Sequence, residues 1–177
     1  MIRQSRQDVS ENHPLHGLFL TLTERGMVQR PYRDRQMVQY LADLLTEFMH
    51  RDNINRITSN SGKPLHYLFD MLAQSSSQML PQVRRAHFKH VGDLALFHLG
   101  LFPEHLTYGR RLMSPAYYAA QGRRSFLIAA ESEYDQETIV LRKLSDHFED
   151  CVAGLNWVKA YTQDPFFRYM FREFEVT

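Results

Sequence analysis

One stretch decides the fold: residues 87–102 read HFKHVGDLALFHLGLF. From Val91 onward, apolar residues fall on nearly every side of a helix, which is typical of a helix packed among other helices. Gly92 and Gly100 each lower helix propensity by about 1 kcal/mol relative to alanine, and this indicates that a neighbouring helix approaches closely. We therefore predict a buried central helix over roughly 78–102.

The rest of the chain shows the same helical spacing of apolar residues. Between residues 33 and 50 they recur at i, i+3, i+4 and i+7, and Asp34 is a suitable N-cap. Comparable patterns predict further helices over 14–26, 64–72, 114–131, 137–161 and 164–177. No segment alternates apolar and polar residues between hairpin turns, as strands do. We therefore predict a single all-α domain over 1–177, a bundle of about six to seven helices around the central one.

Two segments fall outside these helices. Residues 1–11 lack apolar periodicity, and we expect them to be a flexible N-terminal segment. Residues 52–63 are rich in Asn, Ser and Gly, which favour turns. This second segment is predicted to be a connecting loop or a flap over a cleft, and a simple connector is the favoured interpretation.

The composition is that of an ordinary globular domain. The chain has 177 residues, of which 44% are hydrophobic and 23% charged, and this excludes collagen-like and fully disordered proteins. A single cysteine, Cys151, excludes a disulfide framework, and its apolar surroundings predict a buried thiol. The first residues lack the apolar core of a signal peptide, and no apolar run reaches the roughly 20 residues of a membrane span. We therefore expect a cytoplasmic protein with no membrane span.

Charge is segregated along the chain. Residues 81–130 hold 7 Lys and Arg against 2 Asp and Glu, whereas residues 131–177 hold 5 against 10. Most of the basic excess comes from three pairs: Arg84–Arg85, Arg110–Arg111 and Arg123–Arg124. The basic block either pairs with the acidic block, within the fold or across a dimer, or forms an anion site. Pairing is the favoured interpretation, because single-sign blocks are usually solvated or paired.

The alternative is a site for an acidic ligand. Neighbouring residues on a helix point about 100° apart, so the two arginines of a pair cannot both aim at one site. Arginine binds carboxylate or phosphate through two parallel hydrogen bonds. The candidate ligand-binding residues are Arg84, Arg110, Arg111, Arg123 and Arg124, with Tyr117 and Tyr118. Nucleic acid is not an expected partner, because the sequence pI is near 8.0 and no RNA-binding signature is present.

Histidines suggest a second, weaker hypothesis, a metal site. His87 and His90 lie three residues apart on one face of the central helix, close to Asp93. Glu47 and His50 have the Glu-x-x-His spacing of di-iron bundles, but the second copy that such bundles need is missing. We therefore favour histidines satisfied by hydrogen bonds. A transition metal or haem is the alternative, and the sequence requires no cofactor.

Asp93 lies inside the apolar run and needs a partner if it is buried. Lys89 and His90 precede it by four and three residues, so a local ion pair is the favoured interpretation. The alternative is a carboxylate that orients His90 or an incoming arginine at a site.

Two functional hypotheses follow, because the sequence contains no phosphate loop, zinc-protease motif or serine-hydrolase motif. The leading one is a non-enzymatic binding or regulatory module that forms a homo-oligomer, most simply a dimer. Its C-terminal aromatic residues would close the core or form a partner surface: Phe166, Phe167, Tyr169, Phe171 and Phe174. The alternative is a bundle, with or without enzymatic activity, that binds a small acidic ligand or a metal in a cleft between the central helix and the 114–131 helix.

Overall fold

The computed structural model describes residues 13–106, 113–131 and 135–162. In these residues the chain forms eight α-helices and one 3-10 helix: α2 (His16–Met27), α3 (Arg35–Glu47), α4 (Arg51–Ile54), α5 (Leu68–Ser76), α6 (Pro81–Leu101), η1 (Pro103–Leu106), α7 (Pro115–Ala130), α8 (Gln136–Asp146) and α9 (Phe148–Thr162). The described part contains no β-strand, only an isolated antiparallel bridge between Thr58 and Pro64. The all-α prediction is therefore confirmed, with more helices than expected.

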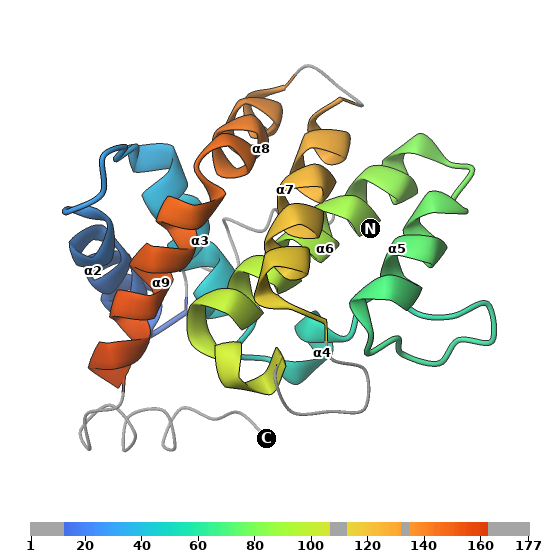
Figure 1. Cartoon of the computed structure of the whole chain (residues 1–177), viewed down its shortest axis with the longest axis horizontal. Helices are drawn as coiled ribbons and strands as arrows, with labels where there is room; N and C mark the ends of the chain where they lie inside the picture. Colours follow the sequence, from blue (N-terminus) through green and yellow to red (C-terminus); the bar gives the residue numbers. More distant parts are fainter. Residues whose placement is uncertain (1–12, 107–112, 132–134, 163–177) are drawn as a thin grey trace.

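Helix α6 runs through the middle of the bundle, as predicted (Figure 1). It packs against α5, α7 and α9, and Val91 and Leu96 are fully buried among them. The helix begins at Pro81, slightly later than predicted, because Ser76 and Ser77 end α5 instead of starting α6. A central helix covered on several sides therefore organises the fold.

Two glycines of α6 lie where neighbouring side chains press against the helix. A methyl group added to Gly92 would lie 2.7 Å from the Phe126 ring of α7. One added to Gly100 would overlap the Leu155 side chain of α9. The close approach that the sequence indicated is confirmed, and its cause is helix packing at interior density.

Local capping residues set two helix starts that the sequence predicted. The Asp34 carboxylate accepts hydrogen bonds from the backbone amides of Gln36 and Met37 at 2.9 and 3.2 Å, which begins α3. The Ser114 hydroxyl accepts one from the Tyr117 amide at 3.1 Å, which begins α7. Both starts lie close to the predicted positions because the caps are local interactions.

Other boundaries differ from the predictions. The helix expected to begin at Pro64 starts only at Leu68, because Pro64 pairs with Thr58 in the isolated bridge. The helix expected over 137–161 breaks at His147 into α8 and α9. These differences arise from contacts that cannot be inferred from the positions of prolines and apolar residues in the sequence.

The predicted loop over 52–63 is more ordered than a simple connector. It begins within α4 and continues into a tight turn, in which the Ser59 amide donates to the Lys63 carbonyl at 2.8 Å. Gly62 in this turn has a φ of 78°, a conformation that favours glycine. Its role as a connector or a flap stays a prediction.

Two predictions concern parts of the chain beyond the described residues. The flexible segment over 1–11 and the aromatic helix over 164–177 both lie there. Across the described ranges, no helix has the length and apolar character needed to cross a membrane.

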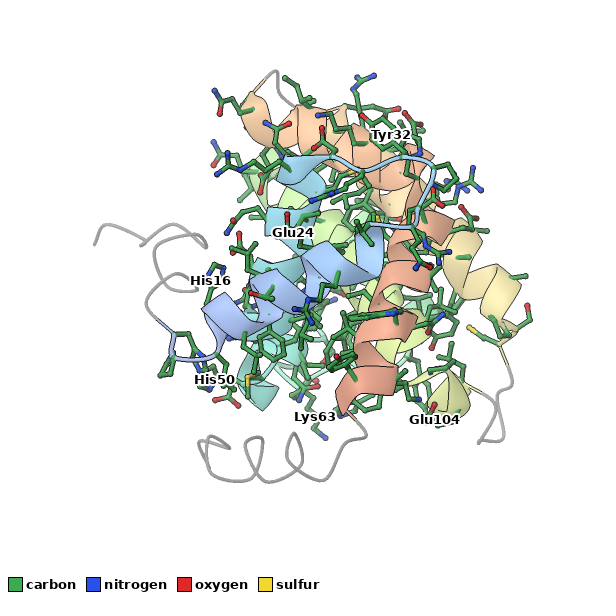
Figure 2. The ribbon with its side chains drawn as sticks, turned by 90° about the vertical axis from the view of Figure 1, so that its left-hand side faces the viewer. His16, Glu24, Tyr32, His50, Lys63 and Glu104 are labelled. Atoms are coloured by element: carbon green, nitrogen blue, oxygen red, sulfur yellow. The ribbon has the colours of Figure 1, made fainter. Side chains whose placement is uncertain are left out.

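A buried polar group joins α2 to α3. His16 Nε2 lies 2.8 Å from Asp43 Oδ1, and both residues are buried. The Gln39 side-chain amide donates to the same carboxylate oxygen at 3.1 Å. Figure 2 shows His16 at the start of α2, on the same side of the molecule as His50. The contact satisfies groups that would be costly to bury alone and holds the first turn of α2 in place.

Candidate functional site

A pocket of about 290 Å³ lies over the N-terminal half of α6, with α5 as one wall and α7 as the other. Figure 1 shows α5 and α7 on the two sides of α6. The lining residues come from all three helices: Phe69, Leu72, Ala73, Ser76, Arg84, Phe88, Tyr117, Gln121, Arg124, Ser125 and Ile128. The sequence predicted a cleft between the central helix and the 114–131 helix, and the structure adds α5 as its second wall.

The two arginines of the first pair face different surroundings. Arg84 lines the pocket, and its guanidinium carbon lies 5.5 Å from the centre of the Phe88 ring, which also lines it. Arg85 is buried and turns toward α8, where its Nη2 lies 3.0 Å from Asp135 Oδ1 and 3.3 Å from Glu137 Oε2. The 100° step between neighbours on a helix explains this division.

The arginines of the third pair divide in the same way. Arg124 lines the pocket from α7. Arg123 points elsewhere, and its Nη1 lies 3.1 Å from Glu149 Oε1 of α9. One arginine of the first pair and one of the third therefore line a single pocket.

The charge of this pocket is unbalanced. Within the described part of the chain, neither Arg84 nor Arg124 forms an ion pair with a carboxylate. The described lining residues include no Asp or Glu. Two arginines thus line a cavity whose described lining supplies no counter-charge.

The remaining ligand-binding candidates have different positions. Tyr117 lines the pocket. Tyr118 is not among the residues found to line it; its ring makes an edge contact with His98 at 6.4 Å, and burial followed by the nearby Tyr117 raises the pKa of its phenol. Arg110 and Arg111 lie outside the described residues. The structure therefore brings together three of the seven predicted residues.

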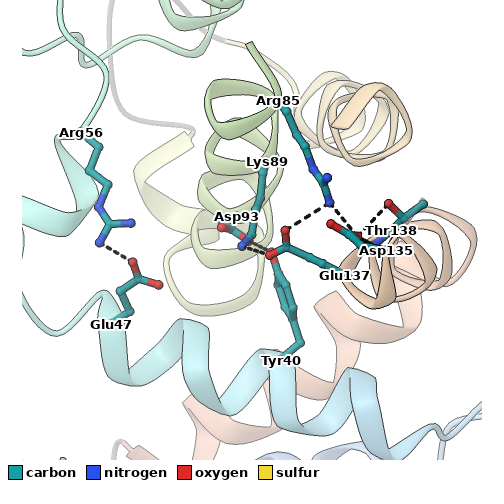
Figure 3. Close-up of polar contacts among 9 residues, drawn as sticks. All are labelled: Tyr40, Glu47, Arg56, Arg85, Lys89, Asp93, Asp135, Glu137 and Thr138. Carbon is teal, nitrogen blue, oxygen red and sulfur yellow. Dashed lines mark hydrogen bonds and ion pairs between the residues drawn. The ribbon is translucent and has the colours of Figure 1, made fainter. Parts of the chain in front are cut away.

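The favoured interpretation of the charge pattern, internal pairing, is confirmed for part of the basic block. Besides the Arg85 contacts, Lys89 Nζ pairs with Glu137 Oε1 (Figure 3). Asp135 also accepts a hydrogen bond from the Thr138 amide at 2.7 Å and so caps α8. The Arg85 guanidinium, together with these hydrogen bonds, lowers the pKa of Asp135 to about 2. We call these five residues the α6–α8 clamp.

Asp93 has a partner that its sequence neighbours did not reveal. The Tyr40 hydroxyl of α3 donates a hydrogen bond of 2.6 Å to Asp93 Oδ1, and both residues are buried (Figure 3). Lys89, one of the expected partners, makes its ion pair with Glu137. Asp93 still acts electrostatically on His90, because its negative charge favours the protonated imidazole. This contact between α3 and α6 could not be predicted from the residues near Asp93 in the sequence.

The histidines proposed as metal ligands on α6 have other environments. His90 Nε2 donates to the Ile54 carbonyl at 3.0 Å. Burial lowers the pKa of His90, and Asp93 opposes that effect. Burial also lowers the pKa of His87. Both rings therefore favour the neutral form that buried or half-buried imidazoles adopt.

The Glu-x-x-His pair, Glu47 at the end of α3 and His50 after it, likewise makes other contacts. Glu47 pairs with Arg56, and the His50 ring meets the His13 ring edge-on at 5.8 Å. Among the described residues, no group of three or more His, Cys, Asp or Glu side chains is arranged to hold a metal ion. Cys151 is buried as predicted, and burial raises the pKa of its thiol.

The sequence did not identify the apolar half of the pocket. Phe69 and Leu72 of α5 and Ile128 of α7 line it, and Phe69 is 57% exposed. These residues follow the same helical spacing as core residues, so the sequence does not distinguish them as pocket residues. Only the exposure of Phe69 in the structure does so.

Comparison of this chain with protein families, with curated proteins and with solved structures finds no match.

Proposed function

We propose that this protein is a binding module for a small anionic molecule, which occupies the pocket between α5 and α7. The observation that supports this most strongly concerns two arginines from different helices. Arg84 and Arg124 line one cavity, and neither is paired with a carboxylate among the described residues. A protein gains nothing in stability by gathering two unpaired cations, so an anion is the natural complement.

Arginine geometry favours an oxyanion. Each guanidinium offers a planar fork of N–H donors that matches two oxygens of a carboxylate or a phosphate. In a partly enclosed cavity the effective dielectric is lower than in water, so this attraction is stronger than at an open surface. One anionic group held between Arg84 and Arg124 would receive donors from both sides.

The pocket volume favours a small ligand. At about 290 Å³ it lies at the lower end of the range of small-molecule sites, roughly 300–1,000 Å³. The lining is mixed, with apolar side chains on all three helices and polar or charged side chains at about half of the positions. This combination is typical of sites that bury the body of a ligand and orient one polar end.

The lining supports a role in binding rather than catalysis. Among the described residues that line the pocket, the titratable ones are Arg84, Arg124 and Tyr117. The described lining includes no His, Asp, Glu, Lys or Cys, the side chains that most often serve as general acids and bases. The non-enzymatic hypothesis is therefore retained.

The test is ligand-dependent thermal stability in matched arginine variants. The full chain is heated with sulfate, phosphate, citrate, benzoate or octanoate, each against chloride at equal ionic strength. We expect at least one anion to raise Tm in a saturable way. The rise should be lost in Arg84→Gln/Arg124→Gln and kept in Arg123→Gln, because Arg123 pairs with Glu149 outside the pocket.

The outcome that contradicts the proposal is equally specific. If no anion of the panel raises Tm, or if the rise is the same in the double variant and in Arg123→Gln, the pocket is not an anion site. The Arg123→Gln variant is the control for a general effect of removing positive charge from α7.

We also propose a cytoplasmic homodimer. Met79 and Leu80, at the turn between α5 and α6, are 94% and 67% exposed, and adjacent exposed apolar side chains are typical of contact surfaces. A single buried thiol, Cys151, requires no oxidising compartment. Sedimentation of the full chain should show a dimer that Met79→Ser/Leu80→Ser converts to a monomer. A wild-type protein that is monomeric contradicts the proposed dimer. A wild-type protein that fractionates with the membrane contradicts the proposed cytoplasmic location.

A further inference from the structure

We infer that the ligand of the α5–α7 pocket is an amphiphilic carboxylic acid: one carboxylate on an apolar body, either an acyl chain or an aromatic ring. This inference rests on the proposed function and narrows it. It excludes hydrophilic polyanions, inorganic phosphate and uncharged lipids as the preferred ligand.

The apolar wall is open to solvent. Phe69 lines the pocket from α5 and leaves more than half of its surface exposed. Leu72 lies one turn further along the same helix, and Ile128 lines the opposite wall on α7. A ligand with an apolar body would remove this surface from water and gain about 25 cal/mol per Å² buried. A fully hydrophilic anion would gain nothing from it.

Arg84 lies over an aromatic ring of the lining. Its guanidinium carbon lies 5.5 Å from the centre of the Phe88 ring, and both residues line the pocket. A cation over an aromatic face keeps its in-plane N–H groups available for a ligand. The carboxylate would therefore bind next to Phe88, which leaves the rest of the ligand in contact with apolar side chains.

The cost of desolvation favours a single carboxylate. The described lining supplies Arg84 and Arg124 as cations, and the other lining groups are neutral. One carboxylate has two oxygens that can accept hydrogen bonds from the guanidinium groups. Citrate or a phosphate ester carries more charge, and removing that charge from water costs more, while the exposed surface of Phe69 offers it nothing in return.

The experiment is calorimetric titration of the full-length protein with hexanoate, octanoate, decanoate and 3-phenylpropionate at one ionic strength. Decanol, citrate, inorganic phosphate and vesicles of anionic phospholipid are titrated in parallel. We expect affinity to rise by up to about fourfold for each methylene group that is buried. Decanol and citrate should bind at least about tenfold more weakly than decanoate, because each lacks one half of the recognised chemistry.

Variants test which residues bind the carboxylate of the ligand and which contact its apolar body. Arg84→Gln/Arg124→Gln should weaken decanoate binding about tenfold or more. Phe69→Ser should flatten the dependence on chain length, and Ile139→Ser is its matched control, because Ile139 is 51% exposed and is not among the lining residues. All four substituted residues have substantial solvent exposure, so the variants are expected to fold.

Each outcome decides between the two proposals. If citrate or phosphate binds more tightly than decanoate and the double arginine variant abolishes that binding, the anion site stands and the amphiphile is overturned. If decanoate binds equally to all variants, or if only vesicles bind, the amphiphile is overturned as well. If none of the probes binds, both proposals fail.

Discussion

Arg84 and Arg85 are neighbours in the chain but belong to different parts of the structure. The Arg84 guanidinium lies over Phe88 at the pocket, whereas Arg85 Nη2 lies 3.0 Å from Asp135 at the start of α8. Within one turn of α6, Arg84 is thus available to a ligand, whereas Arg85 connects α6 to α8 through ion pairs. Their different surroundings lead to different expected effects of mutation.

Replacing Arg85 should destabilise the fold, and replacing Arg84 should not. We expect Arg85→Ala to lower the free energy of unfolding by about 1–3 kcal/mol, because it removes a buried cation and leaves two carboxylates without it. Arg84→Ala should stay within about 0.5 kcal/mol of the wild type. Urea unfolding of both variants is the measurement, and equal effects would contradict the division of roles.

The α6–α8 clamp should weaken in acid. The folded pKa of Asp135, about 2, lies below the 3.8 of the unfolded chain, so its contribution is complete above about pH 4 and is lost as the pH falls toward 2. Asp135→Asn keeps a capping side chain but removes the charge. The variant should therefore lose less stability than the wild type between pH 5 and pH 2. Parallel unfolding curves over this range would show that the charge has no such role.

Removing the Tyr40 hydroxyl should reveal the cost of a buried carboxylate. Tyr40→Phe takes away the donor that lies 2.6 Å from Asp93 Oδ1, and we expect a loss of about 1–3 kcal/mol. Tyr161→Phe is the control, because Tyr161 is 47% exposed and its ring stacks on Trp157. The free energy of unfolding should drop only in the first variant. A Tyr40→Phe variant as stable as the control would mean that the hydrogen bond contributes little.

Two glycine-to-alanine changes should have opposite signs. Alanine at Gly17 of α2 meets nothing within 4 Å, so helix propensity alone applies and the fold should gain roughly 0.5–1 kcal/mol. Alanine at Gly92 would lie 2.7 Å from the Phe126 ring, and overpacking should cost about 1–3 kcal/mol. Thermal unfolding gives both shifts. If Gly92→Ala raises Tm as Gly17→Ala does, α6 and α7 are not in close contact at this point.

The fold class could be predicted because the signals for it are local. The apolar spacing before and after Asp34 and the cap itself are determined by residues within one or two turns. The predicted start of a helix was wrong where a contact outside the helix intervened. Pro64 resembles a helix start, but its pairing with Thr58 in an isolated bridge moves the start of α5 to Leu68.

The candidate site could be predicted only in part, for the same reason. The step of 100° per residue implied that the arginines of a pair would separate, but it did not say which one would face a cavity. That depends on α8, which engages Arg85, and on α9, which engages Arg123. The wall formed by α5 and the contact between Tyr40 and Asp93 join residues far apart in the chain, where sequence spacing carries no information.

The measurement that tests the central claim most directly is the response of individual guanidinium groups to a ligand. Protein with 15N-labelled arginine is titrated with decanoate, and the side-chain Nε–Hε resonances are assigned with the Arg→Gln variants. The Arg84 and Arg124 resonances should shift together and reach saturation at one affinity, while those of Arg85 and Arg123 stay in place. Shifts confined to other arginines, or no saturable shift at all, would contradict an acid-binding pocket between α5 and α7.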